Sequence, residues 1–139
     1  MVDILDEWKR GRTMRLHHAA VVCRSEENAD RFYQGVLGLK RMKSSNAGKD
    51  LIQQIFDIPL ECQFVFYGNE NIGFEVFIHS QKTRKSRHFE HLCLELENRD
   101  AFMAKCRAHG LEVREIPKGE TMLVFIKDYD GNIFEIKEC

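Results

Sequence analysis

Leu16-His-His-Ala-Ala-Val-Val22 and Phe89-Glu-His-Leu-Cys-Leu-Glu95 are the two stretches that decide the fold, because each places a histidine near the start of an apolar, β-prone segment. Each stretch is followed by the same elements in the same order. Helices are predicted over 25–37 and 98–109, since both segments begin with a capping side chain and carry apolar residues at helical spacing. The chain therefore contains an internal repeat.

The ends of the elements repeat as well. Gly38 and Gly110 follow the two helices and suit a left-handed C-cap, which only glycine adopts at little cost. Both halves then close with phenylalanine, glutamate and an aliphatic residue, at Glu75 in the first half and Glu135 in the second. The first half has extra residues, which we assign to a turn and a short helix around 50–58, closed by Pro59.

Each half thus reads strand, helix, strand, strand, strand. A mixed sheet with one helix leaves one face uncovered, so two such units are expected to curl together. The sequence predicts an α+β fold in which two βαβββ modules form a curled mixed sheet around a shared cleft. We expect one domain over 14–138, with module one at 14–79, a linker at 80–87 and module two at 88–138, preceded by a helical extension at 1–13.

Composition narrows the possible functions. Hydrophobic residues make up 43% of the 139-residue chain, no apolar run is long enough for a membrane span, and the formal net charge is −1. Five cysteines without a paired motif indicate reduced thiols. We therefore expect a cytoplasmic protein that acts on a small molecule, without a nucleic-acid or membrane partner. The basic run over 82–88 is interpreted as a solvated linker or an anion-binding lip.

Four residues occupy matching positions in the repeat: His18 and His91 at the first strands, and Glu75 and Glu135 at the last strands. Two imidazoles and two carboxylates suit one divalent ion such as nickel, cobalt, zinc, manganese or iron. A single histidine or glutamate in a strand is usually structural. A carboxylate between large apolar residues, however, is costly to leave unpaired, and a metal would remove that cost.

The neighbouring His17 competes with His18, since alternation along a strand lets only one of them face the cleft. His18 is the preferred ligand because it stands at nearly the same offset from the following glycine as His91 does.

Several segments resemble the vicinal oxygen chelate superfamily, which includes glyoxalase I, bleomycin-resistance proteins and methylmalonyl-CoA epimerase. They are Leu16-His-His-Ala-Ala-Val-Val, Phe32-Tyr-Gln-Gly-Val-Leu-Gly-Leu39, Glu90-His-Leu-Cys-Leu and Lys127-Asp-Tyr-Asp-Gly-Asn-Ile-Phe-Glu135. The resemblance extends over about residues 14–138. It implies a metal-dependent lyase or isomerase, because the glyoxalase and epimerase types use a ligand at the position of Glu75.

The mechanism implied by the resemblance is chelation of two adjacent substrate oxygens, which stabilises an enediolate while a carboxylate, Glu75 or Glu135, moves the proton. Two alternatives stay open: non-catalytic binding of a small ligand, and extradiol-type dioxygenase chemistry, which needs only His18, His91 and Glu135. No glutathione-binding arginine pattern is visible near the N-terminus. We also expect a homodimer that covers sheet edges at 40–43 and 112–115, with the site either within one chain or between two.

Overall fold

The computed structural model describes residues 16–81 and 90–139. The expected N-terminal helix at 1–13, the basic run at 82–88 and nearly all of the expected linker lie outside the described residues. The first half contains four strands and three helical segments, which are β1 Ala19–Cys23, α2 Glu26–Ala29, η1 Asp30–Val36, β2 Lys40–Ala47, α3 Lys49–Phe56, β3 Cys62–Gly68 and β4 Gly73–Ile78.

The second half repeats this order without a counterpart of α3. Its elements are β5 Leu92–Leu96, α4 Arg99–Ala108, β6 Val113–Lys118, β7 Thr121–Lys127 and β8 Ile133–Glu138. The predicted elements are confirmed, with shifts at their ends of one to three residues, except that the strand beginning at Lys40 is longer than expected. It extends to Ala47 because it pairs along its length with β3.

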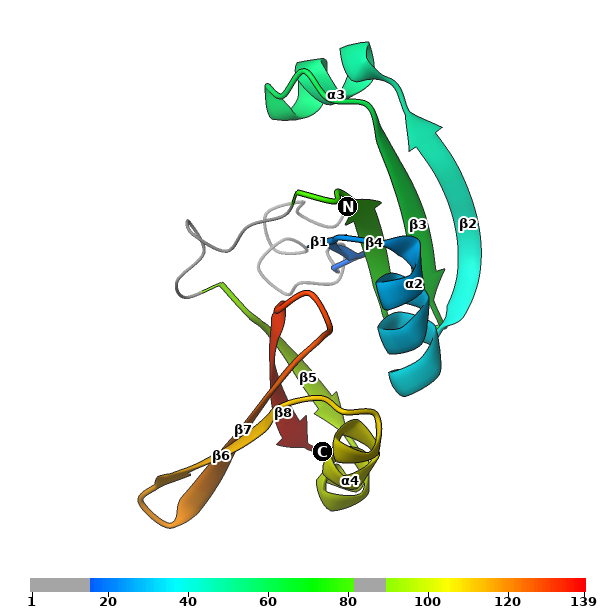
Figure 1. The fold of residues 1–139 in the computed structure, drawn as a ribbon. Coiled ribbons are helices and arrows are strands. Elements are labelled where there is room, and N and C mark those ends of the chain that lie inside the picture. The colour runs from blue at the N-terminus through cyan, green and yellow to red at the C-terminus, as the bar shows by residue number, and fades with distance from the viewer. Residues whose placement is uncertain (1–15, 82–89) are drawn as a thin grey trace, which may run out of the picture.

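Each half forms a four-stranded mixed sheet, with strand order β1-β4-β3-β2 in sheet A and β5-β8-β7-β6 in sheet B. The first and last strands of each half pair in parallel, and the other pairs are antiparallel. The α+β class and the two βαβββ modules are therefore confirmed. The two sheets are separate within the chain, and the β2–β3 and β6–β7 hairpins extend to opposite ends of the molecule (Figure 1).

The two helices that follow β1 and β5 begin where side chains cap them. Ser25 accepts a hydrogen bond from the backbone N–H of Asn28, and Asn98 accepts one from that of Ala101. The expected left-handed glycines are also confirmed, since φ is 71° at Gly38 and 73° at Gly110.

The first long helix differs from a regular α-helix. From Asp30 it continues as η1 with wider π-helical turns, and the N–H of Leu37 donates to the carbonyl of Phe32 at 2.9 Å. In the second half, Met103 and Cys106 are the buried residues of α4, Phe102 is half-buried and Ala101 is exposed.

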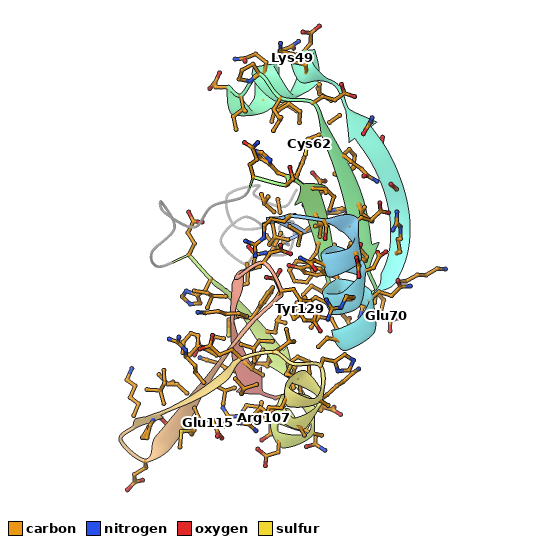
Figure 2. The ribbon with its side chains drawn as sticks, in the orientation of Figure 1. Lys49, Cys62, Glu70, Arg107, Glu115 and Tyr129 are labelled. Atoms are coloured by element: carbon orange, nitrogen blue, oxygen red, sulfur yellow. The ribbon has the colours of Figure 1, made fainter. Side chains whose placement is uncertain are left out.

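One hydrophobic core joins the halves, on the faces of the sheets that the helices cover. Phe134 of β8 is fully buried and its ring lies 5.5 Å from that of Phe32 and 5.9 Å from that of Phe74, centre to centre. A smaller apolar cluster lies under α3 and contains Ala47, Ile52 and Cys62. The helix forms one end of the β2–β3 arm, where Figure 2 labels Lys49 and Cys62.

No helix in the described ranges is both long and apolar enough to cross a membrane. The five cysteines are free thiols, with Cys23, Cys62 and Cys106 buried and Cys93 and Cys139 exposed. Burial raises the pKa of the Cys106 thiol to about 11, so this thiol stays protonated at neutral pH.

Candidate functional site

The candidate residues lie on the face of each sheet that is turned away from η1 in the first half and from α4 in the second, here termed the open face. In β4 the residues Phe74 and Val76 are buried in the core, so alternation directs Glu75 to the open face of sheet A. In β8 the buried residues are Phe134 and Ile136, so Glu135 lies on the open face of sheet B.

The histidines precede the paired strands and lie beside the glutamates. The Nε2 atom of His18 is 3.6 Å from Glu75 Oε2, because β1 pairs in parallel with β4 and sets Ala20 beside Glu75. The Nε2 atom of His91 is 3.9 Å from Glu135 Oε2, where Cys93 of β5 lies beside Glu135. Both halves therefore build the same pair from their first and last strands.

The four side chains are partly accessible. The exposed side-chain fraction is 36% for His18 and 27% for Glu75, and 44% for His91 and 18% for Glu135. Each carboxylate is thus sheltered by its sheet yet reachable by a ligand from the open face.

A phenylalanine lies beside each pair. Phe66 of β3 stands opposite Glu75 and its ring centre is 5.9 Å from that of His18. Phe125 of β7 stands opposite Glu135 and its ring centre is 6.1 Å from that of His91. These phenylalanines were not predicted as site residues, although extending the repeat through the third strand of each half would have aligned them.

The chain brings the candidates together as two pairs and does not gather all four. Three or more metal-type side chains approach within 4.8 Å of one another at one place in the described ranges, and that group is Cys23, Asp128 and Asp130. His18 and His91 line different pockets, the first beside β1, β4 and β5 and the second on sheet B. In one chain the two histidine–glutamate pairs therefore lie apart, while the pocket beside His18 is lined by residues of both halves.

His17 lies next to the first pair, and its Nδ1 atom is 2.8 Å from Nδ1 of His18. Of the two, His18 is the one within ion-pair distance of Glu75 in the described structure. Three histidines were not considered as ligands. His109 is exposed, His79 is half-buried and His88 lies outside the described residues.

The group of Cys23, Asp128 and Asp130 is a structural cluster. Asp128 Oδ1 accepts hydrogen bonds from the backbone N–H groups of Asp130 and Asn132, and Oδ2 accepts them from the Tyr33 hydroxyl at 2.9 Å and the Asn132 amide at 2.7 Å. The Cys23 thiol, 3.7 Å from Oδ2, is a fifth donor, so little acceptor capacity of this carboxylate is left for a metal. Burial, followed by the charge of Asp128, raises the pKa of Tyr33 and keeps its hydroxyl protonated as a donor.

The turn before β8 is thereby joined to the first half. Asp130 Oδ1 accepts from the backbone N–H of Arg24 at 2.9 Å, and Tyr129, labelled in Figure 2, packs its ring under Arg31 at 4.0 Å. Asp130 Oδ2 is buried without a hydrogen-bond partner in the described ranges. The cluster fixes the strand that carries Glu135 against the helix of the other half.

Comparison with known proteins identifies the family of this chain. The family model described as the Glyoxalase/Bleomycin resistance protein/Dioxygenase superfamily matches residues 15–136. No curated protein matches the chain significantly.

Similar solved structures share the fold at low sequence identity. A glyoxalase family protein from Enterococcus faecalis is 19% identical, with a TM-score of 0.70 over 90% of this chain and 98% of that chain. The fosfomycin resistance protein FosX from Mesorhizobium loti is 18% identical, with a TM-score of 0.64 over 88% of this chain and 90% of that chain.

A mutant FosX from Listeria monocytogenes, in complex with Mn(II) and 1S,2S-dihydroxypropylphosphonic acid, is 16% identical, with a TM-score of 0.65 over 88% of both chains. The family match spans nearly all of the described residues, and the two repeated modules agree with it. The chain belongs to the glyoxalase, bleomycin resistance and dioxygenase superfamily, also called the vicinal oxygen chelate superfamily.

Proposed function

We propose that the protein is a divalent-metal-dependent lyase or isomerase that moves a proton next to a substrate carbonyl. The observation that carries the proposal is the twofold occurrence of one histidine and one glutamate, within 3.6 Å and 3.9 Å of each other, on the open faces. The proposed ligands are His18, Glu75, His91 and Glu135, and either glutamate is the proposed base.

The donor atoms fit a metal. Two ligand atoms that are each about 2.1 Å from one ion can lie at most about 4.2 Å apart. Both histidine–glutamate distances fall below this limit, so each pair can bind one ion without moving its strands. Nitrogen and oxygen donors in equal number suit nickel, cobalt, zinc, manganese or iron, and the manganese of the FosX complex is among these.

We propose that a complete site needs two copies of the chain. Each pair alone supplies two ligands, and the pairs lie on different sheets with different pockets. If the open face of sheet A meets the open face of sheet B of a second copy, a twofold axis creates two identical four-ligand sites.

Exposed apolar side chains support such an assembly, because a second copy would remove them from water. In the first half they are Leu16, Met42, Leu51, Ile55 and Ile58, and in the second half Ile116 and Met122. Within residues 16–81 and 90–139, the outer strands β2 and β6 also have unpaired edges.

A bound divalent ion would polarise two adjacent substrate oxygens and stabilise the charge that develops on them. The chain's own residues hold the ion, shelter it and accept the proton. Phe66 and Phe125 flank the pairs with apolar surface, which lowers the local dielectric constant and strengthens these electrostatic effects.

Mixing two variants that each lack one proposed metal ligand tests both the metal site and the dimer. His18→Ala removes a ligand from the first half and His91→Ala removes one from the second, so each homodimer is expected to bind the metal at least about tenfold more weakly. Unfolding and refolding them together yields mixed dimers in which one site has lost both histidines and the other is intact. Metal analysis should then recover about a quarter of the wild-type tight sites.

The control uses His109→Ala, which changes an exposed histidine on the end of α4 and should leave metal content unchanged. No recovery on mixing, combined with tight metal binding by wild type, would place the site within one chain. Wild-type protein with no affinity better than millimolar would exclude the metal site. A light-scattering mass of one chain at tens of micromolar would exclude the dimer.

A further inference from the structure

The open face of sheet B carries a second feature beyond the His91–Glu135 pair. A pocket of about 340 Å³ is lined by apolar side chains of Ile116, Phe125 and Ile133 together with two cationic residues, Arg114 and Lys127. His91 lines the same pocket. A molecule bound at the pair would therefore extend toward these cations.

The strand register places the cations relative to the pair. Arg114 of β6 stands opposite Phe125 of β7, and Phe125 stands opposite Glu135 of β8. The three side chains form a row across one face of the sheet, because directly opposed residues point to the same side. With strands about 4.8 Å apart, the backbone at Arg114 is roughly 10 Å from that at Glu135, which is the length of a small metabolite.

Glu112 holds both cations in place. Its Oε1 accepts from Arg114 Nε at 2.7 Å, and its Oε2 is 3.4 Å from Lys127 Nζ. The hydrogen bond from Arg114 and then the charge of Lys127 lower the pKa of Glu112, so it is ionised at neutral pH. One carboxylate thus faces two cations, and the group has a net charge of plus one.

The guanidinium of Arg114 has more N–H donors than its hydrogen bond to Glu112 uses. In the described ranges only Nε of Arg114 is hydrogen-bonded, and the two terminal nitrogens offer four more N–H groups in a plane that suits a carboxylate or phosphate. Lys127, with a side chain only 26% exposed, adds a partly sheltered charge.

We propose that Arg114 and Lys127 form an anion subsite, so that the substrate carries a carboxylate or phosphate a few bonds from the atoms that bind at the His91–Glu135 pair. The interpretation as a substrate subsite rests on the proposed function. Arg114 and Lys127 are specificity-determining residues, and Glu112 is a positioning residue that orients them.

The test titrates isotope-labelled, metal-free protein with inorganic phosphate and, separately, with succinate, and follows the Arg114 side-chain and Phe125 backbone resonances by NMR. Both sets of resonances should shift saturably at millimolar anion. Arg114→Gln and Lys127→Gln should each weaken the affinity read at Phe125 about tenfold, and Arg114→Lys should retain most of it. The tighter of the two anions identifies the chemical class of the substrate group.

The matched control is Arg107→Gln. Arg107 forms a similar exposed ion pair with Glu115, at 3.2 Å, but on the helix side of sheet B (Figure 2). Its loss should leave anion affinity unchanged. Equal weakening by Arg107→Gln, or no effect of Arg114→Gln and Lys127→Gln, would overturn the subsite.

A parallel titration with manganese separates the two proposals. Arg114→Gln should bind Mn(II) within about twofold of wild type, because it removes no ligand. A protein that binds anions at Arg114 but no metal would contradict the proposed function and leave the anion site standing. A protein that binds metal but no anion would contradict the subsite alone.

Discussion

The two halves of the chain agree where the first and last strands meet and differ at the far end of each open face. Both place a histidine, a glutamate and a phenylalanine in the same arrangement. Beyond it, the first half is closed by α3 and an apolar cluster around Ile52, whereas the second half has a pocket with Arg114 and Lys127. The repeated part suits a metal, because each half supplies one nitrogen and one oxygen donor, and the unrepeated parts suit recognition of an asymmetric substrate.

Cationic residues sharpen this contrast. Lys43 of β2 stands opposite Phe66, as Arg114 stands opposite Phe125, so both halves carry a basic residue two strands from the glutamate. Only Arg114 is joined to a second cation through a shared carboxylate in the described ranges. We therefore expect Lys43→Gln to leave the affinity for anions unchanged.

The largest expected difference between the halves is in the roles of Glu75 and Glu135. Replacement by glutamine keeps the size and one oxygen ligand but removes the basicity. The variant that lacks the base should lose proton transfer by about 10²–10⁴-fold with metal retained, and the other should keep measurable exchange. Incorporation of solvent deuterium into a turned-over substrate measures this, and no effect of either replacement would exclude proton transfer.

The shared core should show the next largest effect. Phe134→Ala removes a fully buried ring that contacts aromatic residues of the first half, and should lower the free energy of unfolding by about 3–5 kcal/mol. Phe64→Ala, in the half-buried periphery of the cluster under α3, should cost less. Urea denaturation compares the two, and equal losses would contradict a single core that joins the halves.

The turn cluster should contribute less. Tyr33→Phe removes one of the donors to Asp128 and should cost about 1–2 kcal/mol, because a buried carboxylate oxygen loses one partner. The substitution keeps the aromatic ring and its packing, so the loss reports the hydrogen bond. Thermal unfolding of the two proteins measures it, with unchanged near-ultraviolet circular dichroism as the control for packing.

The smallest effect should come from Glu112. Its pKa is lowered from the ordinary value of 4.5, so its interactions favour the folded state above that value and are lost as the pH falls through the lowered pKa. Glu112→Gln should therefore have a slightly lower Tm than wild type at pH 7, and the difference should shrink below pH 4. A difference that grows on acidification would contradict the pairing with Arg114 and Lys127.

Much of this organisation could be predicted from the repeat. Helix caps, glycines and alternating apolar residues are local signals, which is why the element order and the mixed character of each sheet were predicted correctly and Glu75 and Glu135 were expected on sheltered faces. The π-helical turns of η1 were not predicted, because tertiary packing overrides local helix propensity there.

The geometry of the candidate site depends on distances between residues that are far apart in the sequence, and local sequence patterns do not determine these distances. His18 and His91 can be aligned in sequence, yet whether their strands converge within one chain is set by the packing of the halves around Phe134. The Arg114–Glu112–Lys127 group was not predicted either. It combines residues of two strands with one before them, and each residue alone has the pattern of an ordinary solvated charge.

Parallel pairing of β1 with β4 and of β5 with β8 has a consequence for the order of folding. The β2–β3 and β6–β7 hairpins join residues close in sequence, whereas each parallel pair must wait for a long intervening segment to be folded back. We therefore expect the histidine–glutamate pairs to assemble late, after the transition state has formed elsewhere. A divalent ion should therefore leave the refolding rate unchanged. It should lower the unfolding rate in proportion to its occupancy, and so lengthen the lifetime of the native protein.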